Sequence, residues 1–217
     1  MAKKERNGQR KRRENFPKRV PDLGYYFVVT DTDATEGNYI RGFRDSLPKE
    51  LQGRIVIKVS KAKTEKLVEA CMEQASLEPQ YGEPWIVFDR DEVVNFDKII
   101  ADAKAQGINA GWSNPCIEIW FDAYFGRMHS YLDSVQCCRG FAETYEKKTG
   151  NEYRKADENI YVVLNQHGDE KAAIMIAESR LQAYERDGVN KPSGMCPCTT
   201  VHKLVGEIKE KVRQSKV

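Results

Sequence analysis

The sequence lacks a long hydrophobic run, and it has few cysteines. No stretch approaches the roughly 18 apolar residues that a transmembrane helix needs, and no apolar core follows the basic N-terminus. We therefore expect neither a membrane-spanning nor a secreted protein, but a cytoplasmic one. The six cysteines are irregularly spaced, which is typical of reduced thiols rather than of a disulfide framework. Cys196, Cys198 and His202 are candidate zinc ligands, but no second pair accompanies them, and a turn with two incidental thiols is the favoured interpretation.

Several catalytic motifs are also absent. The sequence contains no Gly-x-x-x-x-Gly-Lys phosphate-binding loop, no Gly-x-Gly-x-x-Gly turn and no Ser-His-Asp arrangement. The three histidines fall in or beside predicted helices rather than after predicted strands. Nucleotide hydrolysis by this chain itself is therefore not expected.

Composition and charge indicate one compact domain with a basic arm. The 217 residues are 40% hydrophobic and 31% charged, which suits a single domain with its own core. Residues 1–20 hold nine lysines and arginines against two glutamates, a charge of +7, so the remainder carries −5 of the overall +2. We predict a flexible basic arm over residues 1–20 and a single domain over residues 21–217. Such an arm favours contact with nucleic-acid phosphates, and a solvated tail is the alternative.

Strand-like and helix-like patterns alternate along the first half of the chain. Short apolar, β-branched and aromatic runs predict strands over 25–30, 54–59, 84–88 and 108–112. Amphipathic spacing predicts helices over 36–47, 63–76, 95–106, 115–126, 130–147, 169–186 and 200–213. This alternation predicts an α/β fold with a central parallel sheet flanked by helices and with helical C-terminal additions.

Acidic residues follow three of the predicted strands. Asp31 and Glu36 follow the first, Asp89 and Asp91 the third, and Glu118 the fourth. Ligands of open parallel sheets bind outside the carboxyl ends of the strands, so these side chains are expected to converge. Alternate residues of an extended segment point the same way, which lets Asp89 and Asp91 face one ion. Grouped carboxylates favour Mg²⁺ (or Mn²⁺), because without a cation or protons they repel one another.

Each of these residues also has a purely structural interpretation. The Asp-x-Asp pair can form a turn, Thr35 can cap the helix that begins at Glu36, and Glu118 can stabilise a helix N-terminus. Asn114 can bind substrate or cap the helix that follows Pro115. The sequence pattern leaves these alternatives open.

Four motifs together resemble the RloB-like family. They are Thr-Glu-Gly-Asn-Tyr at 35–39, Val-Phe-Asp-Arg-Asp-Glu at 87–92, Ser-Asn-Pro-Cys-Ile-Glu-Ile-Trp at 113–120 and Thr-Thr-Val-His-Lys-Leu-Val at 199–205. The resemblance implies similarity to the Toprim superfamily, with an acidic residue after the first strand and a Mg²⁺-binding Asp-x-Asp pair after the third. It also implies a restriction-modification or phage-defence setting with an ABC-type ATPase partner. The family usually has Glu-Gly directly after the first strand, whereas this chain has Asp31-Thr32.

These observations predict a Mg²⁺-dependent nuclease subunit that cleaves phosphodiester bonds in RNA or DNA. Asp31, Asp89 and Asp91 are the expected metal ligands, Asp31 or Glu36 the proton acceptor, and Glu118 a residue that completes or orients the metal shell. Further polar and cationic side chains are expected to contact substrate: Asn114, Lys58, Lys61, Lys63, Arg12 and Arg13.

Two alternatives belong to other functional classes. A non-catalytic nucleic-acid-binding or regulatory subunit with a degenerate Toprim site would tolerate Asp31 in place of glutamate. A phosphatase of the haloacid-dehalogenase type also carries Asp-x-Asp after a strand. Its nucleophilic aspartate normally follows the first core strand, however, and here the pair follows the third.

Overall fold

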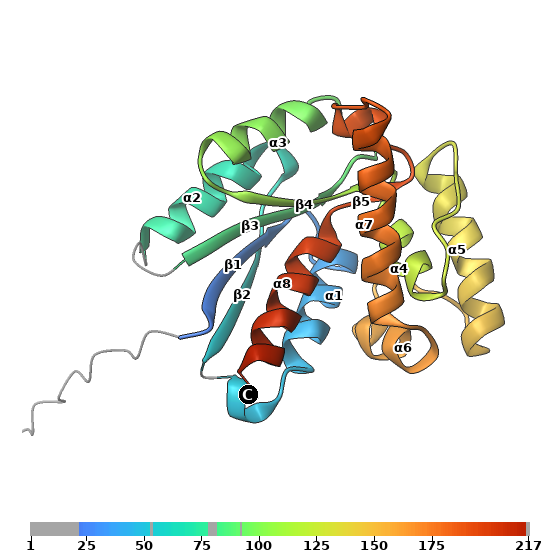
Figure 1. Ribbon diagram of the computed structural model, residues 1–217, viewed down its shortest axis with the longest axis horizontal. Coiled ribbons are helices and arrows are strands. Elements are labelled where there is room, and N and C mark those ends of the chain that lie inside the picture. Colours follow the sequence, from blue (N-terminus) through green and yellow to red (C-terminus); the bar gives the residue numbers. More distant parts are fainter. Residues whose placement is uncertain (1–21, 53, 78–81, 92, 216–217) are drawn as a thin grey trace, which may run out of the picture.

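The computed structural model describes residues 22–52, 54–77, 82–91 and 93–215, and its centre is a five-stranded sheet (Figure 1). The strand order is β2-β1-β3-β4-β5, in which the first four strands are parallel and β5 is antiparallel to β4. The strands are β1 (Gly24–Thr30), β2 (Ile55–Lys61), β3 (Gly82–Asp89), β4 (Asn109–Asn114) and β5 (Cys198–Thr199). The predicted α/β fold is therefore confirmed.

Helices cover both faces of this sheet (Figure 1). One face carries α2 (Leu67–Leu77) and α3 (Phe96–Ala105), and the other carries α1 (Thr35–Asp45) and α8 (Val201–Gln214). A further helical layer lies beside β4 and β5: α4 (Glu118–Tyr124), α5 (Ser134–Thr149), α6 (Ile160–His167) and α7 (Glu170–Arg186). Short 3₁₀ turns occupy Lys49–Leu51, Thr64–Lys66 and Pro192–Gly194. Within the described ranges, no helix combines the length and apolar character needed to cross a membrane.

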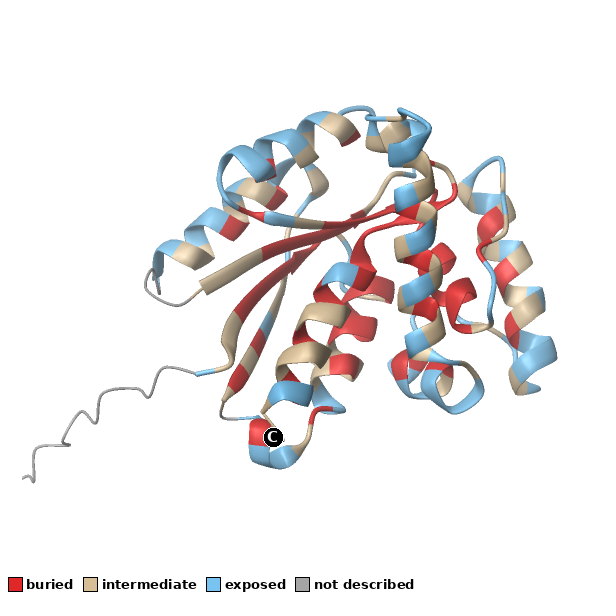
Figure 2. Ribbon diagram, in the orientation of Figure 1, coloured by how far each residue is buried: buried red, intermediate tan, exposed pale blue. Residues whose placement is uncertain are grey.

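Successive residues of each central strand pack into two separate cores, because strand side chains alternate between the faces of a sheet. In β1, Val28 packs on the side of α1 and α8, while Val29 packs on the side of α2 and α3. In β3, Val87 and Ile86 divide in the same way. Burial on both faces explains the continuous apolar runs of the strands, and Figure 2 shows the buried strands between the helical layers.

Two elements, β5 and α6, were not anticipated by the sequence patterns. β5 has two residues, too few for an alternating pattern, and the Thr200 amide beside it donates to the carbonyl of Trp112 on β4 at 2.8 Å. Helix α6 has eight residues and buries only Ile160, Tyr161 and Leu164, which is little more than one amphipathic turn. The predicted basic arm, with Arg12 and Arg13, lies outside the described residues.

Candidate active site

A cavity of about 770 Å³ lies outside the carboxyl ends of β1 and β3, and we call it the acidic cavity. All five acidic residues predicted for the site line it: Asp31, Glu36, Asp89, Asp91 and Glu118. They converge because β1 and β3 are adjacent and parallel, and because α1 and α4 begin at the same edge of the sheet. Residues that lie far apart in the sequence therefore share one half-open cavity.

Asp31 and Asp89 line the acidic cavity at the ends of adjacent strands. One carboxylate oxygen of each, Oδ1, is buried without a hydrogen-bond partner. The other oxygen of Asp89 accepts a hydrogen bond from the Ile117 amide at 3.0 Å. Burial, followed by the charge of Glu36, raises the pKa of Asp31 to about 7. Burial and the charges of Glu36, Asp31 and Glu118 raise the pKa of Asp89 well above its usual value.

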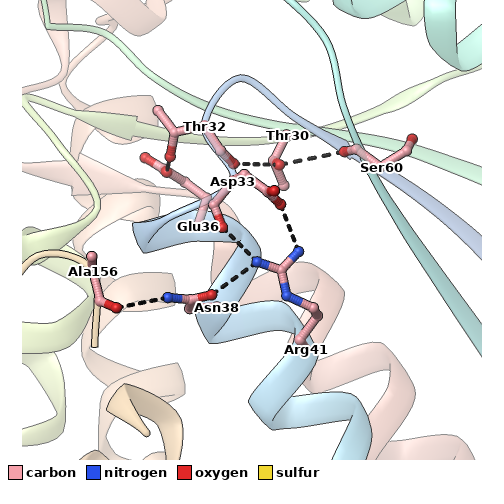
Figure 3. A network of polar contacts seen from close by, with 8 residues as sticks. All are labelled: Thr30, Thr32, Asp33, Glu36, Asn38, Arg41, Ser60 and Ala156. Carbon is pink, nitrogen blue, oxygen red and sulfur yellow. Dashed lines mark hydrogen bonds and ion pairs between the residues drawn. The ribbon is translucent and has the colours of Figure 1, made fainter. Parts of the chain in front are cut away.

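Glu36 approaches these two carboxylates from the first turn of α1. Its side chain is 3% exposed, and burial raises its pKa. The Thr32 hydroxyl donates a hydrogen bond to its carboxylate (Figure 3). The expectation that Thr35 caps this helix is wrong, because α1 begins at Thr35 itself and has Ala34 as its N-cap residue.

Polar contacts fix the segment around α1 to a loop near residue 155. The Thr35 hydroxyl donates to the carbonyl of Lys155 at 2.9 Å. The Asn38 amide donates to the carbonyl of Ala156 at 3.1 Å, as Figure 3 shows. Arg41 donates in turn to Asn38 at 2.8 Å and to the carboxylate of Asp33 at 2.7 Å. Asp33 is thus paired with a guanidinium outside the acidic cavity.

The loop between α5 and α6 brings a cation and a phenol to Glu118. The Tyr153 hydroxyl donates to Oε1 of Glu118 at 3.0 Å, and Nζ of Lys155 lies 3.9 Å from the same oxygen. Glu118 is 1% exposed, whereas Lys155 is largely exposed and lines the acidic cavity. Lys155 and Tyr153 were not predicted, because neither belongs to a periodic element or follows a strand. Lys155 therefore supplies a positive charge next to Glu118, while Lys98, which also lines the cavity, is paired with Asp102.

Asp91 is placed differently from Asp89. Its φ of +30° means that the chain turns after β3, so the two aspartates are not alternate residues of one extended segment, as had been expected. The amide of Asp91 donates to the carbonyl of Pro115 at 2.9 Å, and Oδ1 accepts a hydrogen bond from the Ser134 hydroxyl. Asp91 is exposed and lies at the edge of the acidic cavity.

The carboxylates fit a hard divalent cation in their chemistry. Their oxygens, two of them buried and unpartnered, are the ligand type that Mg²⁺ prefers. Among the described residues, no three of these carboxylates place one oxygen each within 4.8 Å of one another. A cation would therefore be held directly by one or two of them, with water in its other positions, as is usual for Mg²⁺.

A family model described as RloB-like protein matches residues 26–208, which include every acidic residue of the cavity. The chain belongs to the RloB-like family. No curated protein and no solved structure matches it.

Asn114 of this RloB-like chain does not line the acidic cavity, and its contact with substrate stays a prediction. Its side chain is 2% exposed, and its amide donates to the carbonyls of Pro192 and Ser193 at 3.2 and 3.3 Å. It does not cap α4, which begins at Glu118 with Ile117 as its N-cap residue. Asn114 therefore holds the 3₁₀ turn at 192–194 against the end of β4.

The three lysines predicted to contact substrate are exposed. Lys61 ends β2 and is paired in register with Thr30, so it lies at the edge of the sheet that carries the acidic cavity. Lys63 directly precedes Thr64, which lines the cavity. Lys58 lies further back on β2, with Nζ 5.9 Å from the ring centroid of Phe27. None of these three lysines lines the acidic cavity itself.

The candidate zinc ligands do not meet. In the described part of the chain, the one group of three metal-ligating side chains is Cys116, Glu118 and Cys138, whose ligand atoms lie within 4.8 Å of one another. His202 instead contacts Glu178 at 2.9 Å. No sequence pattern links Cys116 to Cys138, because the two cysteines are 22 residues apart.

Proposed function

We propose that this RloB-like protein is a Mg²⁺-dependent (or Mn²⁺-dependent) nuclease subunit that cleaves phosphodiester bonds in RNA or DNA. One observation carries the proposal: Asp31, Glu36 and Asp89 are gathered in one cavity where burial raises the pKa of each. Such an arrangement disfavours the charged forms unless a cation or protons offset them.

Asp89 and Asp31 would hold the cation directly, and Asp91, at the edge of the cavity, would act through a water bound to the cation. When bound, the cation neutralises phosphate charge and helps to generate the water nucleophile. Glu36, whose pKa is raised by burial, is the group suited to take the proton of an attacking water, and Asp31 is the alternative if it does not bind the cation directly. Glu118 holds Lys155 at the cavity mouth, where the ammonium group can contact a substrate phosphate.

The proposed nucleic-acid substrate rests on positive charge, and the proposed partner rests on family membership. Lys61, Lys63 and the basic arm over residues 1–20 would contact phosphates beyond the cleavage site. We also propose that an ABC-type ATPase encoded beside this chain controls cleavage, and that the pair serves phage defence. Support for the partner comes from the family alone.

Nuclease assays on the full chain test the proposal. Purified protein is incubated with tRNA, single-stranded RNA and DNA, and duplexes, in Mg²⁺, Mn²⁺ or EDTA, with and without the ATPase. Asp89→Asn should reduce metal-dependent cleavage by at least about 100-fold, by analogy with the loss of a catalytic acid or base. Asp45→Asn is the matched control, since Asp45 is an exposed partner of Arg44. Equal cleavage by wild type and Asp89→Asn would refute the proposal.

A non-catalytic regulatory subunit is the second candidate, favoured by the presence of Asp31 where the family usually has glutamate. It predicts nucleic-acid binding without cleavage in every metal, with or without the ATPase. Turnover of small phosphomonoesters with an aspartyl-phosphate trapped on Asp89 would instead indicate a phosphatase.

A further inference from the structure

Three cysteines meet beside the acidic cavity. The Sγ atoms of Cys116 and Cys138 are 3.9 Å apart, and Cys116 also contacts Cys137. Cys116 and Cys137 are buried, whereas Cys138 is partly exposed. A disulfide has an S–S distance of about 2.05 Å, so the sulfurs of Cys116 and Cys138 need to approach by about 2 Å. Cys138 is the member of the cluster that a reagent from solvent can reach.

The surroundings of Cys138 favour its thiolate, the reactive form. Hydrogen bonding with Cys116 and the Lys155 ammonium group lower the pKa of Cys138, and together they outweigh burial and the charge of Glu118, which raise it. Elsewhere in the fold, burial raises the pKa of Cys71 to about 11 and that of Cys198 to about 12. The chain therefore places a more reactive thiol next to a buried partner.

Both cysteines belong to segments that shape the acidic cavity. Cys116 lies between Pro115, whose carbonyl accepts from the Asp91 amide, and Ile117, whose amide donates to Asp89. Cys138 lies in α5, which begins at Ser134, and the Ser134 hydroxyl donates to Asp91. The Cys116 thiol donates to the Ser134 carbonyl at 3.9 Å, so the two segments already touch. Drawing the two sulfurs together would shift the backbone that positions Asp89 and Asp91.

We propose that Cys116 and Cys138 are a redox site, at which a peroxide forms a reversible disulfide that weakens metal binding in the acidic cavity. The effect on cleavage rests on the proposed function, whereas the formation of the disulfide does not. Cys116 lies in the motif over residues 113–120 without an assigned role, and Cys138 lies outside all four motifs.

The chemistry balances with hydrogen peroxide as the oxidant. The Cys138 thiolate attacks one peroxide oxygen, the O–O bond breaks, and the other oxygen leaves as water after taking a proton. The Cys116 sulfur then attacks the resulting sulfenic sulfur, the S–S bond forms, and the hydroxyl group leaves as water with the Cys116 proton. The two thiols together lose two electrons, and the peroxide gains them and is reduced to two waters. A dithiol such as dithiothreitol reverses the reaction by thiol–disulfide exchange.

A zinc site made of Cys116, Glu118 and Cys138 is the competing interpretation of the same cluster. The Lys155 ammonium group argues against it, because it lies 3.9 Å from Glu118 and interacts with Cys138. The Lys155 ammonium group already offsets the negative charge of Glu118 and Cys138 that zinc would neutralise.

Peptide mapping of the full-length protein under non-reducing conditions tests the disulfide. Reduced protein is treated with hydrogen peroxide, the remaining thiols are alkylated, and the digest is analysed by mass spectrometry. A Cys116–Cys138 cross-link is expected in wild type and in Cys196→Ser, a control at a half-buried cysteine outside the cluster. Cys138→Ser should form no cross-link, and Cys116→Ser should leave Cys138 as a sulfenic acid that dimedone traps. No cross-link in wild type, or tight zinc binding that needs both cysteines and blocks oxidation, would overturn the proposal.

Metal binding tests the regulatory effect without depending on catalysis. Calorimetric titration with Mn²⁺ should show affinity about 10-fold or more weaker in the oxidised protein, the size of effect typical of a disturbed outer shell. Dithiothreitol should restore the affinity, and Cys138→Ser should not respond to peroxide. Unchanged Mn²⁺ affinity in cross-linked protein would refute the regulation, whereas absent nuclease activity with a changed affinity would refute only the proposed function.

Discussion

Replacing Asp31 by asparagine should stabilise the metal-free protein at neutral and alkaline pH. Burial and the charge of Glu36 raise the pKa of Asp31 from 3.8 to about 7. In the unfolded chain Asp31 is ionised above about pH 4, while in the folded protein it stays protonated to about pH 7. The folded state binds the extra proton, so the free energy of unfolding falls as the pH rises through this window.

The size of the effect follows from the gap between the two pKa values. One pKa unit corresponds to about 1.4 kcal/mol, so the gap between 3.8 and about 7 costs at most about 4 kcal/mol above pH 7. That is a large part of the roughly 5–15 kcal/mol by which domains are stable. For a chain of this size it corresponds to a difference in Tm of about 10 °C. Asp31→Asn has no carboxylate to ionise and should keep this stability.

Denaturation by urea from pH 4 to pH 8 measures the effect, with EDTA present to remove metal. Wild type and Asp45→Asn should lose stability relative to Asp31→Asn between pH 4 and pH 7 and run parallel to it above that pH. Added Mg²⁺ should stabilise wild type at pH 8 more than Asp31→Asn, because a cation offsets the ionised carboxylates. If the curves of wild type and Asp31→Asn run parallel from pH 4 to pH 8, Asp31 ionises normally in the fold and our account of the cavity is wrong.

Three further predictions concern positive charges, from Lys155, from the basic arm and from a bound metal. Lys155→Ala should weaken substrate binding or slow cleavage, while Lys155→Arg should retain most of both. Equal activity of wild type and the two variants would show that Lys155 does not contact substrate. Deleting residues 1–20 should weaken nucleic-acid binding and flatten its dependence on salt in filter-binding assays; an unchanged slope would show that the arm makes no phosphate contacts. Mn²⁺ binding at pH 6.5 should release protons, measured by calorimetry in buffers of different ionisation enthalpy, and should release fewer from Asp31→Asn.

The convergence of the acidic residues could be predicted because it depends on topology. Apolar runs identified β1, β3 and β4, and parallel neighbours bring the residues after them to one edge of the sheet. That argument needs only the position of each residue after its strand. It therefore placed Asp31, Glu36, Asp89 and Glu118 in the right region without any side-chain geometry.

At Asp91 the predicted local geometry, an extended segment with both aspartates on one side, was wrong. Sequence pattern does not report the turn that begins after Asp89, where Asp91 has a φ of +30°. It also gives no information on Lys155, which reaches the cavity because Thr35 and Asn38 hold its loop through backbone carbonyls. Contacts between side chains and remote backbone leave no periodic trace in a sequence.

The carboxylates of the acidic cavity differ from other partly buried acids of the fold, and this difference favours a functional interpretation. Glu170 lies 2.7 Å from Lys209 and accepts hydrogen bonds from two tyrosine hydroxyls, and Glu83 lies 2.6 Å from Lys211. Asp31 and Asp89 instead keep a buried oxygen without a partner and face other carboxylates, whereas Asp122, which also has an unpartnered buried oxygen, is paired with His129. A buried carboxylate without a hydrogen-bond partner lowers folding stability. Natural proteins retain such destabilising groups mainly at functional sites. A cation that binds there would therefore raise folding stability. Metal affinity and folding stability should both change when one of these carboxylates is replaced.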